Sequence, residues 1–345
     1  MASSAGTRAA VATGDARGKS AARAVAPAAG AAPGRGAPAA EDAHGKAAPA
    51  GFALGAVCAI AGVLGFSFKA ILVKLAYGAG PVDPTTLLAL RMAYSAPLFA
   101  VLAWWSSRRA TLQLARADWT MLAVLGFIGY YLSSLLDFLG LQYITVSLER
   151  LILFVYPTFV VLLSALFLGR RVTRRALAAL VVCYAGIALA FVGDLRLGGN
   201  REATVLGSAL VLASAALYAT YLVCAARSIA RMGSLRFVAL AMLLSTLFVL
   251  GQFALTRPMS ALAVPPRVHV LALLMAVFST VLPTWLIAES IRRLGANTAS
   301  LIGTLGPVFT IGLGVLLLGE PLAAPQIGGA VLVLAGVALV TLKPR

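Results

Sequence analysis

Charge is scarce in this sequence, and that scarcity indicates its class. Only 11% of the 345 residues are charged, 61% are hydrophobic, and the mean hydropathy is +0.95. A soluble globular domain averages about 25% charged and about 45–50% apolar residues. We therefore expect a membrane protein. The net charge of +17 would favour nucleic acid as the partner of a soluble protein, but here the charges lie in short connections between apolar runs. No nucleic-acid partner is expected.

Cysteine and histidine are also rare. Cys58, Cys183 and Cys224 lie in apolar runs without C-x-x-C spacing, His44 lies in the amino-terminal tail, and His269 lies where a loop meets an apolar run. The pattern favours neither a disulfide framework nor a zinc site, so we expect no metal and no cofactor. The apolar runs also lack the DxxxD, HxxxH and GxSxG arrangements of intramembrane enzymes.

Large apolar residues are nearly missing from residues 1–50, which contain 21 alanines. Such a segment cannot bury enough surface to fold, so we predict a disordered Ala/Arg-rich cytoplasmic tail. It lacks the apolar core of a secretory signal peptide. Its acid-poor composition also resembles organelle transit peptides, but a solvated tail is the preferred interpretation.

The remaining chain contains apolar runs that are long enough to cross a bilayer, which takes about 20 residues. Backbone polar groups inside a bilayer must be satisfied within helices, so we predict an all-α membrane protein. The ten predicted transmembrane helices cover residues 52–76, 85–105, 119–141, 146–168, 174–193, 204–226, 236–256, 269–290, 296–318 and 322–342.

Lysine and arginine are unevenly distributed between the two predicted sides. With the amino terminus in the cytoplasm, twenty lie in the inner segments and four lie in the outer loops. This bias follows the positive-inside rule. We expect both termini to be cytoplasmic and the protein to be integral to a bacterial-type inner (plasma) membrane.

One stretch of the chain occurs twice. Residues 148–189 align without a gap on residues 298–339, and thirteen of the 42 positions are identical, including Pro157 with Pro307 and Gly169 with Gly319. A repeat of about 150 residues is too long for a solenoid unit. It indicates a duplicated half instead.

The duplication predicts two five-helix repeats, 52–193 and 204–342. Because each half has an odd number of helices, the two halves cross the membrane in opposite directions. Inverted repeats of this kind are typical of secondary transporters, whose substrate site lies between the halves near the midplane.

Two prolines mark the predicted midplane. Pro157 and Pro307 each lie about eleven residues into a predicted helix, roughly 16 Å deep at about 1.5 Å per residue. Proline removes an amide donor and kinks a helix, so we expect paired kinks that line a central cavity. The neighbouring candidates for the substrate pathway are Gly303, Thr304 and Gly306.

Aromatic residues within the spans are further candidates to line the pathway. These are Tyr130, Tyr131, Tyr156, Tyr218, Tyr221 and Trp285.

Ionisable residues inside apolar spans are costly and are therefore functional candidates. We predict a buried Arg91–Asp137 ion pair that fixes two helices or gates a vestibule, whereas Lys74 and Arg150 are expected to reach the headgroups by snorkelling. Glu289 either forms an ion pair with the arginines that follow it or takes part in coupling. The candidates for coupling or gating are Lys74, Asp137, Glu149, Arg150 and Glu289.

Several motifs resemble those of the EamA-type family of the drug/metabolite transporter superfamily. They are FKAILVKLA and LLALRMAYSAPL in the first two spans, PVF and LLLGEPL within 307–322, and the closing GGAVLVLAGVALV. The resemblance covers about 52–342. It implies a ten-helix inverted-repeat bundle with a central cavity that exports amino acids, related metabolites or toxic compounds.

The resemblance also implies roles for particular positions. Lys74, Arg91, Pro157 and Pro307 occupy matching places in the family pattern. One departure stands out, because the acid of the family's LLLGE motif is present at position 320 but is replaced by arginine in LFLGRR of the first half. The role of that acid is therefore lost or reversed there.

Together these features predict a secondary transporter, an exporter of small metabolites such as amino acids, that works by alternating access. Its partners would be a small-molecule substrate and the bilayer, and a homodimer is left open. The excess of positive charge near the predicted outer mouth favours a substrate with a carboxylate. Proton coupling through Asp137 or Glu289 is one hypothesis, and uniport or exchange fits equally well. The alternatives are a non-transporting membrane scaffold and an intramembrane lipid-modifying enzyme.

Overall fold

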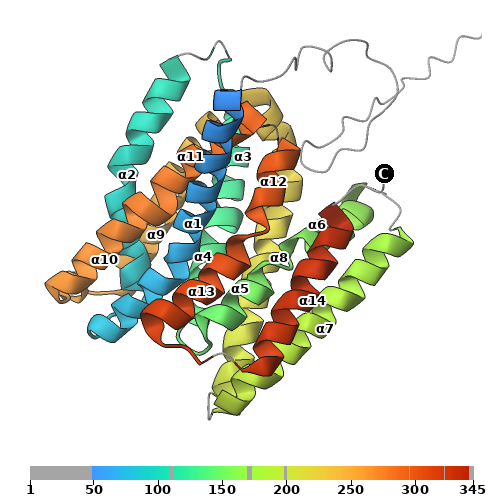
Figure 1. The fold of residues 1–345 in the computed structure, drawn as a ribbon. Coiled ribbons are helices and arrows are strands. Elements are labelled where there is room, and N and C mark those ends of the chain that lie inside the picture. Colours follow the sequence, from blue (N-terminus) through green and yellow to red (C-terminus); the bar gives the residue numbers. More distant parts are fainter. Residues whose placement is uncertain are drawn as a thin grey trace, which may run out of the picture.

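The computed structural model describes residues 49–341, except 109, 111, 169–172, 198–199, 295 and 322. In this part of the chain every regular element is a helix (Figure 1). The elements are α1 (Pro49–Ala79), α2 (Pro84–Arg108), α3 (Arg116–Gly126), η1 (Phe127–Leu132), α4 (Ser133–Gly140), α5 (Val146–Leu153), α6 (Tyr156–Leu168), α7 (Arg174–Leu197), α8 (Arg201–Met232), α9 (Ser234–Thr256), η2 (Met259–Leu262), α10 (Pro266–Ala276), η3 (Val277–Val281), α11 (Leu282–Leu294), α12 (Ala296–Gly303), α13 (Gly306–Leu318) and α14 (Ala324–Thr341). Nearly all of the predicted tail, 1–50, lies outside the described residues.

Eight helical stretches of the described chain are long and apolar enough to cross a membrane, and two shorter apolar helices follow them at Gly306–Leu318 and Ala324–Leu339. The protein is therefore an all-helical membrane protein. Most helices extend beyond their predicted ends, as in the eighth span, which runs over Pro266–Leu294 rather than 269–290. The ninth predicted span, 296–318, is divided between two helices, and neither helix is long enough to cross a membrane by itself.

Local sequence explains where several helices begin and end. Pro84 and Pro266 each occupy the first position of a helix, where no amide donor is needed. The side chain of Asn200 caps α8 by accepting a hydrogen bond from the amide of Ala203 at 3.1 Å. Helix α13 ends at Gly319, whose positive φ of 64° favours glycine.

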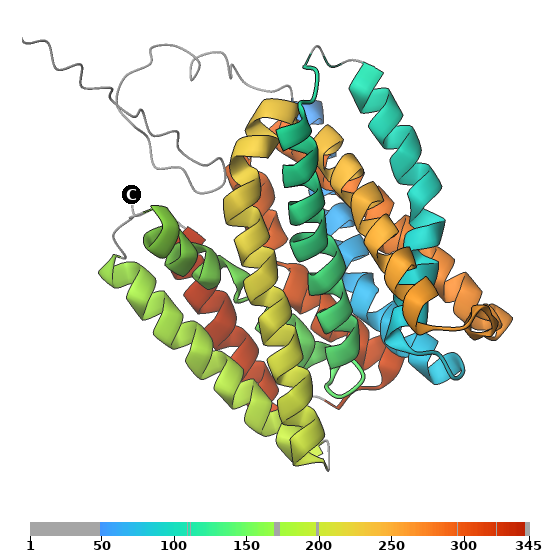
Figure 2. The ribbon, with the colours of Figure 1, turned by 180° about the vertical axis from the view of Figure 1, so that it is seen from behind.

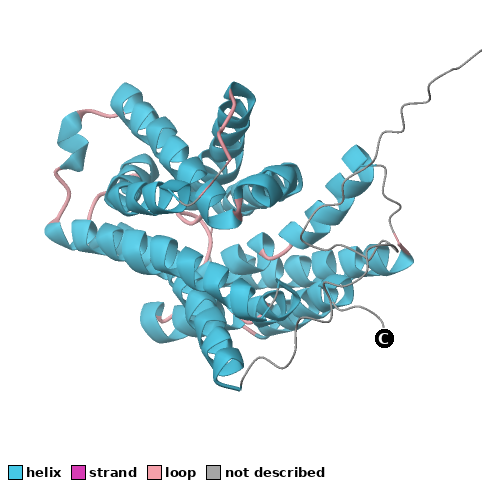
Figure 3. Ribbon diagram, turned by 90° about the horizontal axis from the view of Figure 1, so that it is seen from above, coloured by secondary structure: helices cyan, strands magenta, loops and turns pink. Residues whose placement is uncertain are grey.

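Helices α7 and α14 lie side by side along one edge of the bundle (Figures 1 and 2). Glycines allow the close approach, because a Cβ at Gly186 would lie 2.7 Å from the carbonyl oxygen of Gly329. Helix α1 packs against α10, α11 and α13. The view from above shows the helices gathered side by side and joined by short loops (Figure 3). The first helix of the described chain is therefore packed mainly against helices of the second half.

The fourth and ninth predicted spans are broken rather than kinked. Helix α5 ends at Leu153 and α6 begins at Tyr156, while α12 ends at Gly303 and α13 begins at Gly306. The helices are thus interrupted at the places where the prolines predicted kinks, and each interruption is a full break between two helices. The prolines occupy the second position of α6 and α13, where their missing amide costs no intrahelical hydrogen bond. Corresponding bounds of the two breaks are 150 residues apart.

Two short π-helical segments, η1 and η3, interrupt the third and eighth spans. They begin at Phe127 and Val277, again 150 residues apart. In the second segment the hydroxyl group of Thr280 donates a hydrogen bond of 2.9 Å to the carbonyl oxygen of Met275, which helps to satisfy a backbone group that the wider turn frees. These segments have no counterpart among the sequence predictions. π-Bulges occur frequently at functional sites.

Candidate functional site

A cavity of about 490 Å³ lies between the helices of the bundle. Its walls come from α1, α2, η1, α4, α5 and α6, and from α8, α9, η3 and α11. Both π-helical segments contribute, through Gly129 and Tyr130 on one side and Ser279 and Thr280 on the other. The volume falls within the range of about 300–1,000 Å³ that is usual for small-molecule sites.

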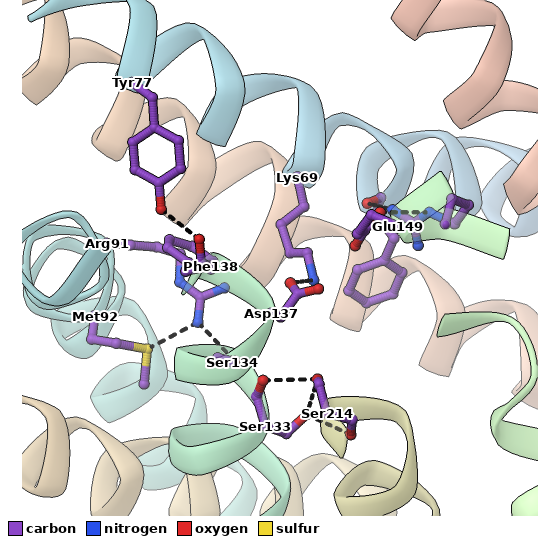
Figure 4. Close-up of polar contacts among 12 residues, drawn as sticks. Lys69, Tyr77, Arg91, Met92, Ser133, Ser134, Asp137, Phe138, Glu149 and Ser214 are labelled. Atoms are coloured by element: carbon purple, nitrogen blue, oxygen red, sulfur yellow. Dashed lines mark hydrogen bonds and ion pairs between the residues drawn. The ribbon is translucent and has the colours of Figure 1, made fainter. Parts of the chain in front are cut away.

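An ion pair lies in the wall of this cavity. The Nζ atom of Lys69 on α1 lies 2.7 Å from Oδ2 of Asp137 on α4 (Figure 4). The Asp137 side chain is almost completely buried, and both residues line the cavity. The predicted Arg91–Asp137 ion pair is thus wrong. Helix α1 packs against this part of the bundle and places Lys69, instead of Arg91, within ion-pair distance of the Asp137 carboxylate.

Arg91 on α2 is buried and lines the cavity, with uncharged groups as its hydrogen-bond partners. Its Nη2 atom donates to Oγ of Ser134 at 3.3 Å and to the sulfur of Met92 at 3.6 Å (Figure 4). The guanidinium also lies 5.0 Å from the ring centroid of Phe138. Its Nε atom has no hydrogen-bond partner in the described part of the chain. In the described part of the chain Arg91 thus forms no direct ion pair, and the carboxylate of Asp137 is near enough only for a longer-range attraction.

Glu149 and Arg150 on α5 are enclosed by the protein. The Glu149 side chain is 0% exposed, and neither of its oxygens has a hydrogen-bond partner among the described residues. Arg150 lines the cavity and its Nη2 atom donates to the carbonyl oxygen of Phe66 at 3.2 Å, while its Nε atom lies 3.9 Å from Glu149. The expectation that Arg150 snorkels is wrong, because its guanidinium turns to α1.

Tyrosines and serines form another part of the cavity wall. The hydroxyl groups of Tyr130 and Tyr221 are hydrogen-bonded at 2.8 Å, and the rings of Tyr218 and Tyr156 have centroids 5.4 Å apart. The four tyrosines make an amphipathic wall, with aromatic faces for an apolar group and hydroxyls for polar ones. The sequence singled out these tyrosines as candidates.

The small hydroxyl residues of the cavity were missed from the sequence. Ser133 and Ser214 are hydrogen-bonded to each other at 3.0 Å (Figure 4), and Thr280 and Thr284 line the opposite wall. Serine and threonine are common in membrane helices, where they often bond to their own backbone. Only the tertiary structure distinguishes these four serines and threonines from the other serines and threonines of the spans.

The candidates at the two breaks lie elsewhere. Pro157, Gly303, Thr304, Gly306 and Pro307 are not among the residues that line the cavity. The carbonyl oxygen of Gly306 accepts a hydrogen bond of 3.2 Å from the hydroxyl group of Ser67 on α1. These residues therefore shape the helices behind the cavity wall.

Two further candidates lie on α11. Trp285 is 43% exposed on the outside of the bundle. Glu289 forms ion pairs with Arg292 and Arg293 one turn further along the helix, at 2.5 and 2.6 Å. Of the two hypotheses for Glu289, the structure therefore favours the ion pair with the arginines that follow it over a role in coupling. Neither Trp285 nor Glu289 lines the cavity.

A second cavity, of about 420 Å³, lies at the end of the bundle where α1 ends. Lys74, Asp194 and Glu320 line it. Glu320 reaches across to the beginning of α5, where it accepts hydrogen bonds from the amides of Val146 and Ser147 at 2.7 and 3.3 Å. A carboxylate is favourable there because a helix amino terminus carries free amides and a partial positive charge.

Cavities, buried charges and interrupted helices in an all-helical membrane bundle define the class of membrane transporters. The particular family follows from sequence comparison: the model of the EamA-like transporter family matches residues 53–192 and 205–342. The chain belongs to this family. No group of His, Cys, Asp and Glu residues suited to a metal ion is found in the part of the chain that the structure describes.

Curated relatives carry transporter names. The "uncharacterized transporter YcbK" of Bacillus subtilis is 32% identical over 305 residues, which cover 84% of this chain and 95% of the relative. An "uncharacterized transporter" of Archaeoglobus fulgidus is 26% identical over 283 residues, which cover 81% and 95%. A solved crystal structure is similar in fold, with a TM-score of 0.54 and 21% identity over 83% of this chain and 95% of its own. The relatives point to a transporter rather than an enzyme.

Proposed function

We propose that this protein is a secondary transporter that exports small carboxylate-bearing metabolites, such as amino acids or related compounds, across a bacterial-type inner membrane. The observation that carries the proposal is the 490 Å³ cavity, whose wall holds buried charges and whose lining comes from both segments that match the family. A non-transporting scaffold would have no use for buried charge at a cavity, because such charge is costly in a membrane.

The mechanism we propose is alternating access by two inverted five-helix repeats, with ten helices crossing the membrane and both termini in the cytoplasm. The paired breaks before Pro157 and Pro307 support it, as does the equal spacing of η1 and η3. Helices interrupted at matching positions of inverted repeats are typical of secondary transporters. In this mechanism the breaks act as hinges between the helix segments on either side. The excess of lysine and arginine on one side of the membrane sets the orientation of the protein.

Arg91 is the proposed anchor of the substrate carboxylate. A buried guanidinium without an anion is unfavourable, and a substrate carboxylate would supply that anion through charge-assisted hydrogen bonds. Ser134 lies beside it and adds a hydroxyl group. The tyrosine wall, which includes Tyr156 and Tyr218, would hold the apolar part of the same substrate.

The first test is a substrate screen. Cells that express the chain are challenged with toxic carboxylates and with the matching amides, and compounds that pass are measured as labelled flux in proteoliposomes. We expect export of carboxylates and little export of their amides. Flux of neither, in a correctly folded preparation, contradicts the proposal and favours the scaffold, whereas a chemically altered compound favours the enzyme.

The second test is specific to Arg91. Arg91→Gln should lower the flux of a transported carboxylate about 10- to 100-fold, because a hydrogen bond to a charged group contributes about 1.5–3 kcal/mol. Arg91→Lys should retain part of the flux, since it keeps the charge but loses the planar fork. The matched control is Arg201→Gln, because Arg201 is exposed at the start of α8. Equal flux in all three variants would remove Arg91 from the site.

A further inference from the structure

Two buried carboxyl groups in the cavity wall lack the hydrogen-bond donors that such groups need. Asp137 receives Lys69 on its Oδ2 atom, but its Oδ1 atom and both oxygens of Glu149 have no donor in the described part of the chain. The two carboxyl groups lie next to each other, one on α4 and one on α5 (Figure 4). Their side chains are only 2% and 0% exposed.

Two other acids, the buried Asp194 and the half-buried Glu320, have different surroundings. Asp194 accepts hydrogen bonds from the amide and the hydroxyl group of Thr145 and from the side-chain amide of Gln326. Glu320 accepts from the beginning of α5 and from the hydroxyl group of Ser147. These two acids have several hydrogen-bond donors each. The Asp137–Glu149 pair does not.

A proton resolves both problems of this pair at once. Two ionised carboxylates that are close neighbours repel each other, and a buried carboxylate without donors is strongly unfavourable. One proton on Glu149 removes one negative charge and supplies a hydroxyl donor that can reach Oδ1 of Asp137, so two of the three unpartnered oxygens gain a partner. The remaining negative charge is balanced by Lys69, which already lies 2.7 Å from Asp137.

The surroundings allow the proton to leave as well as to bind. Asp137 lines the cavity, which gives the pair a route to water. Arg150, whose Nε atom is 3.9 Å from Glu149 and has no hydrogen-bond partner among the described residues, is placed to neutralise Glu149 after the proton has gone. Several titratable or charged groups surround the pair: Lys69, Lys74 and Tyr77 on α1, Arg91 on α2 and Arg150 on α5. Asp194 and Glu320 accept hydrogen bonds from the beginning of α5.

We propose that Asp137 and Glu149 share a single proton in this conformation and form the proton-binding site of the transporter. The proton is taken up from water in the cavity and released to it again, and no other bond changes. The site rests on the geometry of the two carboxyl groups. Its use in coupling export to a proton gradient rests on the proposed function. Glu149 thereby takes the place that the sequence analysis gave to Glu289.

The direct test follows the proton and requires no substrate. Infrared spectra of the full chain in lipid vesicles are recorded over a pH series in normal and heavy water. We expect the carbonyl band of a protonated carboxylic acid at pH 7, where an ordinary glutamate, with a pKa of about 4.3, is ionised. The band should shift in heavy water and disappear at higher pH.

Three variants assign the band. Glu149→Gln should abolish it at pH 7, whereas Glu289→Gln, the matched control at the surface ion pair, should leave it unchanged. Asp137→Asn removes the neighbouring negative charge, so the band should disappear at a pH lower by about one unit or more. A wild-type protein without the band at pH 7, or a Glu149→Gln protein that retains it, would overturn the proposal. The wild-type result decides even if a variant does not fold.

The coupling is tested separately. In proteoliposomes that transport a carboxylate, an imposed pH gradient should change the flux of the wild type and of Glu289→Gln, but not that of Glu149→Gln. The band without any effect of the gradient overturns the coupling. The band without flux of any compound overturns the proposed transport and supports the proton site, so the two failures are distinguishable.

Discussion

Helices α5 and α12 share a backbone design but differ in chemistry. Both contain eight residues and end two residues before the next helix begins. Helix α5 carries Glu149 and Arg150, whereas the positions 150 residues later are Ala299 and Ser300. The helix break is thus common to the two halves of the chain, whereas the charged residues occur in only one of them.

The same asymmetry extends to the whole cavity. The first segment that matches the family supplies the charged side chains Lys69, Arg91, Asp137 and Arg150. The second segment supplies hydroxyl and aromatic groups such as Thr284 and Tyr218, and no charged residue of it lines the cavity in the described part of the chain. In our account one half binds the charged part of a substrate and the other half provides the opposing wall.

The largest effect is expected when the missing charge is added to α12. Ala299, the counterpart of Glu149, is 5% exposed. Ala299→Glu places a carboxylate there without a partner, which should lower the free energy of unfolding by about 3–5 kcal/mol. Thermal unfolding in detergent measures the loss of stability. Ala299→Ser is the control, because it adds a small uncharged polar group at the same position. Wild-type stability of Ala299→Glu would contradict the view that α12 has no place for charge.

A smaller effect is expected from uncapping α5. Glu320→Ala leaves the amides of Val146 and Ser147 without their acceptor, which should cost about 1–3 kcal/mol of stability. Glu320→Gln should cost less, because an amide oxygen still accepts a hydrogen bond. Glu202→Ala, in the exposed first turn of α8, is the control. If both Glu320 variants unfold like the wild type, the cap does not hold α5 in place.

The smallest effect is expected where the two halves are alike. Pro157→Ala and Pro307→Ala should each change stability by less than about 1 kcal/mol, because both prolines occupy the first turn of a helix, where proline is tolerated. The two variants should also resemble each other in thermal unfolding. A loss of more than about 3 kcal/mol in one of them would show that the breaks are not equivalent.

The sequence predicted the elements that depend on composition and periodicity. Apolar runs located the spans, and the repeat of Pro157 and Pro307 located the two breaks. What it missed depends on neighbours in space. Asp137 pairs with Lys69 instead of Arg91 because of where α1 packs, and no spacing in the sequence encodes that choice. Arg150 follows the start of a predicted span closely and so resembled an interface residue.

The π-helical segments illustrate a second limit of the sequence. The stretches FIGYY of η1 and VFSTV of η3 share no residue at corresponding positions. The wider turn is decided by packing against other helices, such as the close contact of Gly129 with Tyr221 on α8, where an added Cβ would lie 2.3 Å from the ring. A local sequence pattern therefore does not reveal it.

We propose that the cavity opens alternately to the two sides of the membrane. The most direct measurement replaces Cys58, Cys183 and Cys224, introduces Thr284→Cys in the cavity wall, and applies a membrane-impermeant thiol reagent to each side in turn. Leu166→Cys, at a position 76% exposed on α6, is the lipid-facing control and should not react. We predict that the cysteine at position 284 reacts from both sides. A cysteine there that reacts from neither side, or from one side only under every condition, would contradict the account.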